Sequence, residues 1–253
     1  MHQILGEKAD LFIEKGLVLN VYSGELIPHN IAVSGERIFY TGPGRPGVGP
    51  ETRIVCADDR VVVPGYIDPH FHPWMIYNPV TFGEAACSRG VTTLFCDNLL
   101  FYLLMGVDRF EAMMAALWRA PIKYFWFCRA VPQTPMKDEE ALFSVSNLQR
   151  LLRNPLVQSL GEITRWPDLL KKNHKIRAMI RSTRELKKRV DGHTAGARYD
   201  RLAALAWMGV DSCHESIRGQ EALDKLRLGF SVMLRESSLR QDLRRLLKAI
   251  KEA

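Results

Sequence analysis

The chain has 253 residues, a formal net charge of +7 and 47% hydrophobic residues, which is ordinary for a globular protein with a sizeable core. No apolar run approaches the roughly 20 residues needed to cross a bilayer, so we expect no membrane partner. The five cysteines are scattered without a C-x-x-C pair, which argues against a disulfide framework and favours the cytoplasm. The excess positive charge lies mostly in two stretches of helical periodicity, 171–189 and 240–251. Since no stacking surface accompanies that charge, we expect no nucleic-acid partner.

Residues 1–63 are expected to form a small β module of short strands and turns. Apolar and β-branched runs alternate there with Asn, Gly and Asp residues, which commonly end strands. The expected strands are Leu11–Ile13, Leu17–Leu19, Ile31–Val33, Arg37–Tyr40 and Arg53–Val55.

From Val61 onward, strands alternate with helices, which predicts a parallel sheet wrapped by helices. A capping box of Asp108 and Glu111 predicts a helix that runs to Arg119, and single helices are expected over 138–153 and 239–251. The expected strands are Val61–Asp68 (buried), Val91–Asp97, Lys123–Val131, Val157–Ile163, Val190–His193, Val210–His214 and Phe230–Leu234. A closed (β/α)₈ barrel has eight strands. We therefore predict an α/β fold in which residues 64–253 form a TIM barrel that is incomplete, with about seven strands.

The segment His70-Phe71-His72 directly follows the first barrel strand. In extended backbone, residues i and i+2 point to the same side, so both imidazoles can bind one metal ion. Active sites of such barrels lie where the strands end. The alternative is a pair of histidines in an ordinary polar loop.

Three further side chains end later strands on the same rim. Glu162, His193 and His214 end the fourth, fifth and sixth barrel strands. Together with His70 and His72 they make a site for one or two divalent ions, which Glu162 can bridge.

The stretch Pro64-Gly65-Tyr66-Ile67-Asp68-Pro69-His70-Phe71-His72 resembles the opening signature of the amidohydrolase superfamily. The stretches 160–162, 190–196, 213–215 and 221–229 are similar to those of bacterial adenine deaminases, and more so to the branch labelled "putative adenine deaminase". The resemblance implies a barrel of the metal-dependent hydrolase type. It also implies that His70, His72, Glu162, His193 and His214 are metal ligands, with manganese or iron favoured and zinc as the alternative.

The activity implied by this resemblance is hydrolytic deamination of an aminopurine, adenine to hypoxanthine and ammonia, in a cytoplasmic homo-oligomer. Glu162 and Glu215 are the expected catalytic carboxylates. Glu215 either donates a proton or orients a metal-bound histidine. The expected substrate contacts are Trp74, Arg235 and Glu236. For Trp74 the alternative is burial against a loop, and for the other two a structural ion pair is favoured.

The sequence departs from the adenine deaminases at the mouth of the site. Pro73-Trp74-Met75-Ile76 replaces their Ile-Glu-Ser-Ser, and Asp97-Asn98-Leu99-Leu100 replaces their Asp-Pro-His-Glu. The chain is also expected to lack strand eight, which carries a metal-binding and proton-shuttling aspartate in the superfamily. We therefore expect weak or no deaminase activity from this chain, with metal binding retained.

Two alternatives stay open. One is another cyclic amide or amidine hydrolase of the superfamily, such as a dihydroorotase-like enzyme. Those members carry a carboxylated lysine on strand four, where this chain has Glu162, which favours the deaminase branch. The other is a non-catalytic metal-binding remnant of the scaffold.

Overall fold

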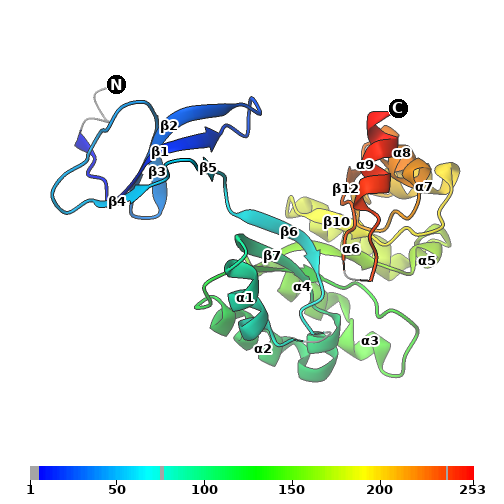
Figure 1. The fold of residues 1–253 in the computed structure, drawn as a ribbon. Coiled ribbons are helices and arrows are strands. Elements are labelled where there is room, and N and C mark those ends of the chain that lie inside the picture. Colours follow the sequence, from blue (N-terminus) through cyan, green and yellow to red (C-terminus); the bar gives the residue numbers. More distant parts are fainter. Residues whose placement is uncertain (1–5, 75–76, 238) are drawn as a thin grey trace. The chain divides into compact units, whose positions relative to one another are not determined.

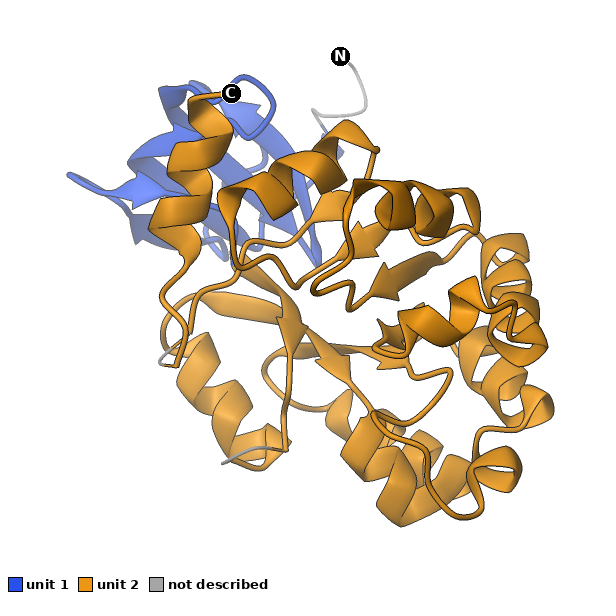
Figure 2. Ribbon diagram, turned by 90° about the vertical axis from the view of Figure 1, so that its right-hand side faces the viewer, with its two compact units in different colours: residues 1–65 blue, residues 66–253 orange. Residues whose placement is uncertain are grey.

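The computed structural model describes residues 6–74, 77–237 and 239–253, so Met75 and Ile76 lie outside the described residues. The chain divides into two compact units, residues 1–65 and 66–253, which are coloured separately in Figure 2. Among the helices of the described ranges, none combines the length and the apolar character needed to cross a lipid bilayer.

The first unit is a five-stranded sheet in the order β3-β2-β1-β4, with β5 also paired to β1. Its strands are β1 (Leu11–Leu19), β2 (Leu26–Ser34), β3 (Arg37–Gly42), β4 (Arg53–Cys56) and β5 (Val61–Val62), labelled in Figure 1. The expectation of two separate strands over 11–13 and 17–19 is wrong. They form one strand, because a register shift between Ile13 and Gly16 carries the pairing with β2 past Lys15, whose φ is +63°.

The second unit contains a seven-stranded sheet in the order β12-β11-β10-β9-β8-β7-β6. All its neighbouring strands are parallel, and the sheet curls like part of a barrel wall (Figure 2). The strands are β6 (Tyr66–Phe71), β7 (Val91–Asp97), β8 (Lys123–Cys128), β9 (Val157–Ile163), β10 (Arg189–Gly192), β11 (Ser212–Cys213) and β12 (Ser231–Val232). The prediction of an incomplete (β/α)₈ barrel with about seven strands is confirmed.

Helices connect the parallel strands, and a last one follows β12. They are α1 (Pro79–Cys87), α2 (Leu99–Leu117), α3 (Glu139–Leu142), α4 (Val145–Arg153), α5 (Trp166–Leu170), α6 (His174–Glu185), α7 (Tyr199–Trp207), α8 (Gly219–Arg227) and α9 (Leu243–Lys251). The side-chain oxygens of Asn78, Ser144 and Asn173 accept backbone N–H groups at the starts of α1, α4 and α6. Such caps satisfy donors that the first helical turn leaves unpaired.

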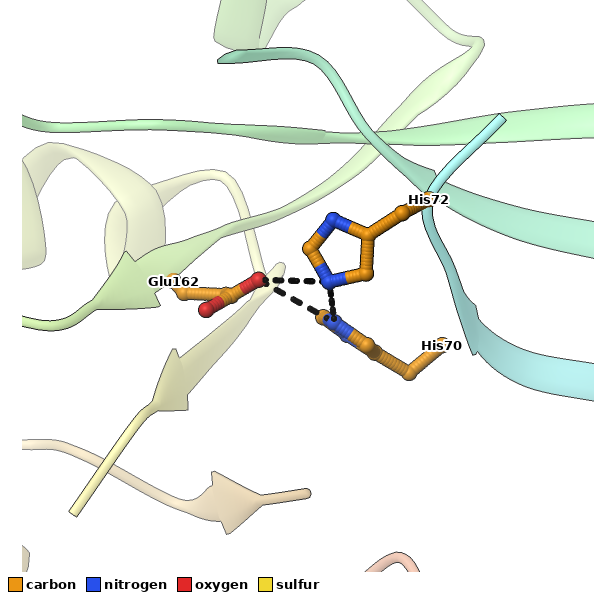
Figure 3. Close-up of side chains that lie close together, drawn as sticks. All are labelled: His70, His72 and Glu162. Atoms are coloured by element: carbon orange, nitrogen blue, oxygen red, sulfur yellow. Dashed lines mark hydrogen bonds and ion pairs between the residues drawn. The ribbon is translucent and has the colours of Figure 1, made fainter. Parts of the chain in front are cut away.

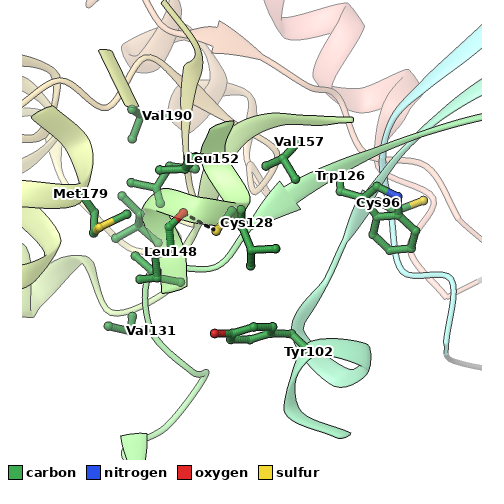
Figure 4. Close-up of a cluster of buried hydrophobic side chains, with 14 of the residues drawn as sticks. Cys96, Tyr102, Trp126, Cys128, Val131, Leu148, Leu152, Val157, Met179 and Val190 are labelled. Atoms are coloured by element: carbon green, nitrogen blue, oxygen red, sulfur yellow. Dashed lines mark hydrogen bonds between the residues drawn. The ribbon is translucent and has the colours of Figure 1, made fainter. Parts of the chain in front are cut away.

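The main hydrophobic core lies between the sheet and its helices and is densest around β8, β9 and β10 (Figure 4). Trp126, Leu148, Leu152, Met179 and Val190 are all fully buried there. Burying one such aliphatic side chain contributes about 1.5–3 kcal/mol to stability. This core therefore fixes the central strands, whose carboxyl ends carry the candidate site.

Several predicted helix boundaries are wrong. The helix expected from Asp108 to Arg119 corresponds to the part of α2 after Gly106, whose φ of +68° separates it from a preceding helical segment that begins at Leu99. Instead of forming the predicted capping box, Asp108 forms an ion pair with Arg150. The helix predicted over 138–153 is two helices, because Ser144 has extended backbone and caps the second one. The last helix begins at Leu243, four residues later than predicted.

The prediction of one buried strand over Val61–Asp68 is also wrong. Val61 and Val62 pair with β1 in the first unit, whereas β6 begins only at Tyr66. Ile67 is 61% exposed, because β6 is an edge strand with a neighbour on one side only. Because β6 lies at the edge of the sheet, it is not buried on both faces as a strand inside a closed parallel barrel would be.

Candidate metal centre

The five expected ligands lie at the carboxyl ends of adjacent or nearby parallel strands of the second unit. His70 lies in β6, and His72 follows directly after it. Glu162 lies near the end of β9, and His193 and His214 come directly after β10 and β11. Parallel strands end on one rim of their sheet, so the topology brings these side chains together.

The first group consists of His70, His72 and one oxygen of Glu162 (Figure 3). Glu162 Oε1 lies 3.1 Å from His70 Nε2 and 3.3 Å from His72 Nε2. The two imidazole nitrogens are 3.2 Å apart. Two nitrogens and one carboxylate oxygen thus face a common point, which is the donor set that Zn²⁺, Mn²⁺ and Fe²⁺ accept.

The second group uses the other oxygen of the same carboxylate. Glu162 Oε2 lies 2.9 Å from His193 Nδ1 and 3.4 Å from His214 Nε2. His193 Nδ1 and His214 Nε2 are 3.1 Å apart. Glu162 therefore stands between two histidine pairs and presents one oxygen to each, as a carboxylate bridging two ions would.

Behind His214 lies Asp191, a residue that the sequence analysis missed. Asp191 Oδ2 lies 2.7 Å from His214 Nδ1, and Oδ1 accepts a hydrogen bond from Ser212 at 2.8 Å. A carboxylate in this position fixes the imidazole tautomer, so that Nδ1 carries the proton and Nε2 faces the site. Asp191 lies two residues before His193 in the same extended segment, and this period-two spacing was the available signal.

Two more charged residues at the rim, Asp97 and Arg129, were also missed as site residues. Asp97 is the last residue of β7, and Arg129 follows the last residue of β8. Arg129 Nη2 lies 2.9 Å from Glu162 Oε1, and Asp97 Oδ2 lies 3.6 Å from His72 Nδ1. The same strand-end rule that selected the histidines would have selected both residues.

The buried and half-buried ionisable groups of the site shift one another's pKa. Burial opposes ionisation of Glu162, but hydrogen bonds from His193, His214 and His70 and the charge of Arg129 hold its pKa well below the usual range. Burial also opposes the charged form of His214, but Asp191 and Glu162 raise its pKa well above the usual value. The pKa of His72 is lowered, chiefly by burial. Glu162 is therefore a carboxylate at neutral pH, and His72 is a neutral imidazole.

Glu215, the expected proton carrier, lies beside Arg235, one of the expected substrate contacts. Glu215 forms an ion pair with Arg235, which also binds Asp242 at 2.8 Å. The structural ion pair favoured for Arg235 is thus present, with Glu215 and Asp242 in place of Glu236. Glu236 is exposed and accepts a hydrogen bond from the backbone N–H of Leu243 at 3.0 Å.

Trp74 lies beside the first histidine pair. The planes of the Trp74 and His72 rings are nearly perpendicular, at 84°, with the centroids 4.9 Å apart, and the Trp74 ring also meets that of Phe101 at a centroid distance of 6.2 Å. The side chain is half-buried. Trp74 thus belongs to the wall beside His72, and contact with Phe101 accounts for part of its burial.

Comparison with known proteins supports this description. No protein-family model matches the chain. A protein of Halalkalibacterium halodurans named "putative adenine deaminase" is 38% identical over 98% of this chain and 43% of its own length. The chain therefore spans about two fifths of the length of the curated relatives it matches.

Solved structures show the same fold at low identity. D-hydantoinase from Bacillus sp. AR9 aligns with a TM-score of 0.63 and 16% identity over 88% of this chain and 56% of that one. N-acyl-D-glutamate deacylase from Bordetella bronchiseptica, solved with zinc and a phosphonate inhibitor, aligns with a TM-score of 0.60 and 18% identity over 89% and 58%. The chain thus has an amidohydrolase-type fold, and over nearly its whole length it is a homologue of the adenine deaminase-like proteins.

Proposed function

We propose that this chain carries the metal-binding part of a hydrolytic deaminase that converts adenine to hypoxanthine and ammonia. The observation that carries the proposal is the position of Glu162 between two histidine pairs. Relatives named "putative adenine deaminase" over 95–98% of the chain support the aminopurine as substrate. The chain spans only about two fifths of the length of those relatives. The proposed activity therefore belongs to a protein of their full length, in which this chain supplies the metal-binding residues.

In this proposal His70, His72 and Glu162 Oε1 hold one divalent ion. His193, His214 and Glu162 Oε2 hold a second one. An ion bound there supplies Lewis acidity, which lowers the pKa of bound water toward about 7 and so provides a nucleophile at neutral pH. The ions are manganese or iron by family resemblance, and zinc is the alternative that the Bordetella deacylase supports.

The other residues bind, orient and move protons. Trp74 offers a ring edge and face beside His72, against which a planar base can pack. Glu215 has one oxygen in the ion pair with Arg235, and among the described residues its other oxygen has no hydrogen-bond partner. We propose that this free oxygen carries the proton that the leaving amine needs. Arg235 then fixes the Glu215 side chain and does not contact the substrate itself.

The fourth strand of the barrel, β9, distinguishes the proposed deaminase from the cyclic amide hydrolases. Strand β9 reads Val-Gln-Ser-Leu-Gly-Glu-Ile and contains no lysine. A carboxylated lysine therefore cannot bridge ions from this strand, and Glu162 takes its place.

Metal content of the purified protein tests the proposal first. We expect one or two equivalents of manganese, iron or zinc in the wild-type chain and their loss in His70→Ala/His72→Ala. His174→Ala is the matched control, because His174 is an exposed residue at the start of α6. Metal-free protein that stays folded and binds no added Mn²⁺ or Zn²⁺ would contradict the proposal.

Activity is measured separately, as ammonia release from adenine. The assay uses a metal-loaded protein that is as long as the relatives. We expect Glu215→Gln to lower kcat by about 10²–10⁴-fold while metal content stays unchanged. Equal turnover by Glu215→Gln would remove Glu215 from the proton-transfer role and leave the metal site standing.

A further inference from the structure

Arg129 is an arginine buried inside the rim. It is 2% exposed, and its guanidinium binds two carboxylates. Nε lies 3.0 Å from both oxygens of Asp97, and Nη2 lies 2.9 Å from Glu162 Oε1. Nη1 donates to Gln133 Oε1 at 3.2 Å. Every nitrogen of the guanidinium therefore has a protein partner.

The local sequence builds this arrangement from two neighbouring strands. Asp97 ends β7, and its partner in the register of β8 is Phe127, two residues before Arg129. The side-chain oxygen of Asn98 accepts the backbone N–H of Arg129 at 3.1 Å. Asp97 and Asn98 thus hold both the guanidinium and the backbone of Arg129. Asp97 matches the aspartate of the Asp-Pro-His-Glu stretch of adenine deaminases, and the departure from that stretch begins at Asn98.

The contacts of Arg129 complete a ring of interactions that passes through Asp97, His72 and Glu162. Arg129 joins Asp97 to Glu162, while Asp97 lies 3.6 Å from one nitrogen of His72 and Glu162 Oε1 lies 3.3 Å from the other. A buried arginine requires a carboxylate partner, and Asp97 would be sufficient for this purpose. The additional contact with Glu162 Oε1 restricts how that carboxylate can rotate.

Rotation of Glu162 decides how its two oxygens are used. In the observed orientation one oxygen faces His70 and His72, and the other faces His193 and His214. If the Glu162 carboxylate rotated out of this orientation, both of its oxygens could chelate one ion. The other histidine pair would then have no carboxylate. A planar guanidinium anchored at both ends opposes that rotation, whereas a lysine ammonium is a point charge without the fork.

We propose that Arg129, anchored by Asp97, is a positioning residue that keeps Glu162 in its bridging orientation. The inference rests on the proposed metal site and adds the feature that decides whether two ions share one carboxylate. Arg129 acts through Glu162, since each of its nitrogens already contacts a protein side chain.

Electron paramagnetic resonance of the Mn²⁺-loaded chain tests the inference, because two ions that share a bridging carboxylate give an exchange-coupled signal that isolated ions do not. We compare the wild type with Arg129→Lys, which keeps the charge, and with Asp97→Asn, which keeps the shape but loosens the anchor. The matched control is Arg165→Lys, because Arg165 also binds two carboxylates, Glu139 and Asp168, which are not part of the metal site.

We expect the coupled signal in the wild type and in Arg165→Lys, and its loss in Arg129→Lys and Asp97→Asn. Affinity for the second Mn²⁺ should fall about 10- to 100-fold in both variants, the usual effect of changing a residue that supports a ligand. Circular dichroism must show that the variants remain folded. A variant that unfolds is replaced by Arg129→Gln, for which the same loss is expected.

The outcomes separate this inference from the proposed function. A coupled signal that survives unchanged in folded Arg129→Lys and Asp97→Asn overturns the positioning role and leaves the metal site intact. A wild-type chain that binds a single Mn²⁺ overturns the positioning role alone, because there is then no bridge to maintain, and one that binds no Mn²⁺ overturns both.

Discussion

At the scale of single residues, the candidate site depends on which nitrogen of each imidazole faces it. His214 donates Nδ1–H to Asp191 and turns Nε2 toward Glu162, whereas His193 turns Nδ1 toward the same carboxylate. A histidine in a sequence carries no sign of this choice. The partner on the other side of the ring decides it.

The raised pKa of His214 makes metal binding depend on pH. A metal ion requires the neutral imidazole, so binding must displace the proton that Asp191 and Glu162 stabilise on His214. We expect the affinity for Mn²⁺ to rise with pH, by about tenfold per pH unit for one released proton, until the pH passes the raised pKa. Titration calorimetry in two buffers of different ionisation enthalpy measures the released protons.

Asp191→Asn is the informative variant for this dependence. It removes the charge that raises the pKa of His214, so the pH at which affinity levels off should move down. Affinity that is constant between pH 6 and pH 8 in the wild type would show that His214 is not a ligand.

At the scale of elements, the end of β9 shapes the site as much as its ligands do. Gly161 precedes Glu162 and has a backbone φ of +149°, which residues other than glycine rarely adopt. A Cβ atom there would lie 2.7 Å from the backbone oxygen of Asp191. Strands β9 and β10 therefore approach so closely at this point that only glycine fits between them.

Gly161→Ala should accordingly damage both stability and the site. We expect a loss of about 1–3 kcal/mol from overpacking and a comparable amount from backbone strain, together with weaker metal binding as Glu162 shifts. Chemical denaturation measures the first effect and metal titration the second. Gly196→Ala is the control, because Gly196 also has positive φ but no atom within 4 Å of its added Cβ. Equal losses in the two variants would show that close packing of β9 and β10 is unimportant.

At the scale of the whole molecule, the candidate ligands come from residue 70 to residue 214, and the ends of four strands, β6, β9, β10 and β11, must assemble before an ion finds its donors. A metal ion held by these residues would therefore bind the folded second unit far better than the unfolded chain. Bound metal stabilises the fold by about 2.7 kcal/mol when its free concentration is 100 times Kd.

Thermal unfolding should report this coupling. For a unit of this size we expect Mn²⁺ or Zn²⁺ at that concentration to raise Tm by about 5–10 °C, and a chelator to reverse the shift. His70→Ala/His72→Ala should show no comparable shift, because this variant is expected to lose its metal. A Tm that does not respond to metal in the wild type would mean that the rim holds no ion in the folded state.

The sequence by itself determined the alternation of strands and helices, the seven strands of the barrel and the five candidate ligands. These follow from local patterns: period-two and helical spacing of apolar residues, and histidines or a carboxylate where strands end. The sequence did not determine every helix boundary, since Gly106 and Ser144 interrupt helices through backbone angles that periodicity does not show.

The tertiary structure alone decided how those ligands are used. It placed Glu162 between the two histidine pairs, Asp191 behind His214, and Arg129 against both Asp97 and Glu162. It also paired Glu215 with Arg235 and made β6 an exposed edge. These relations join residues far apart in the chain, and their distances depend on strand register and sheet curvature, which no local pattern of residues encodes.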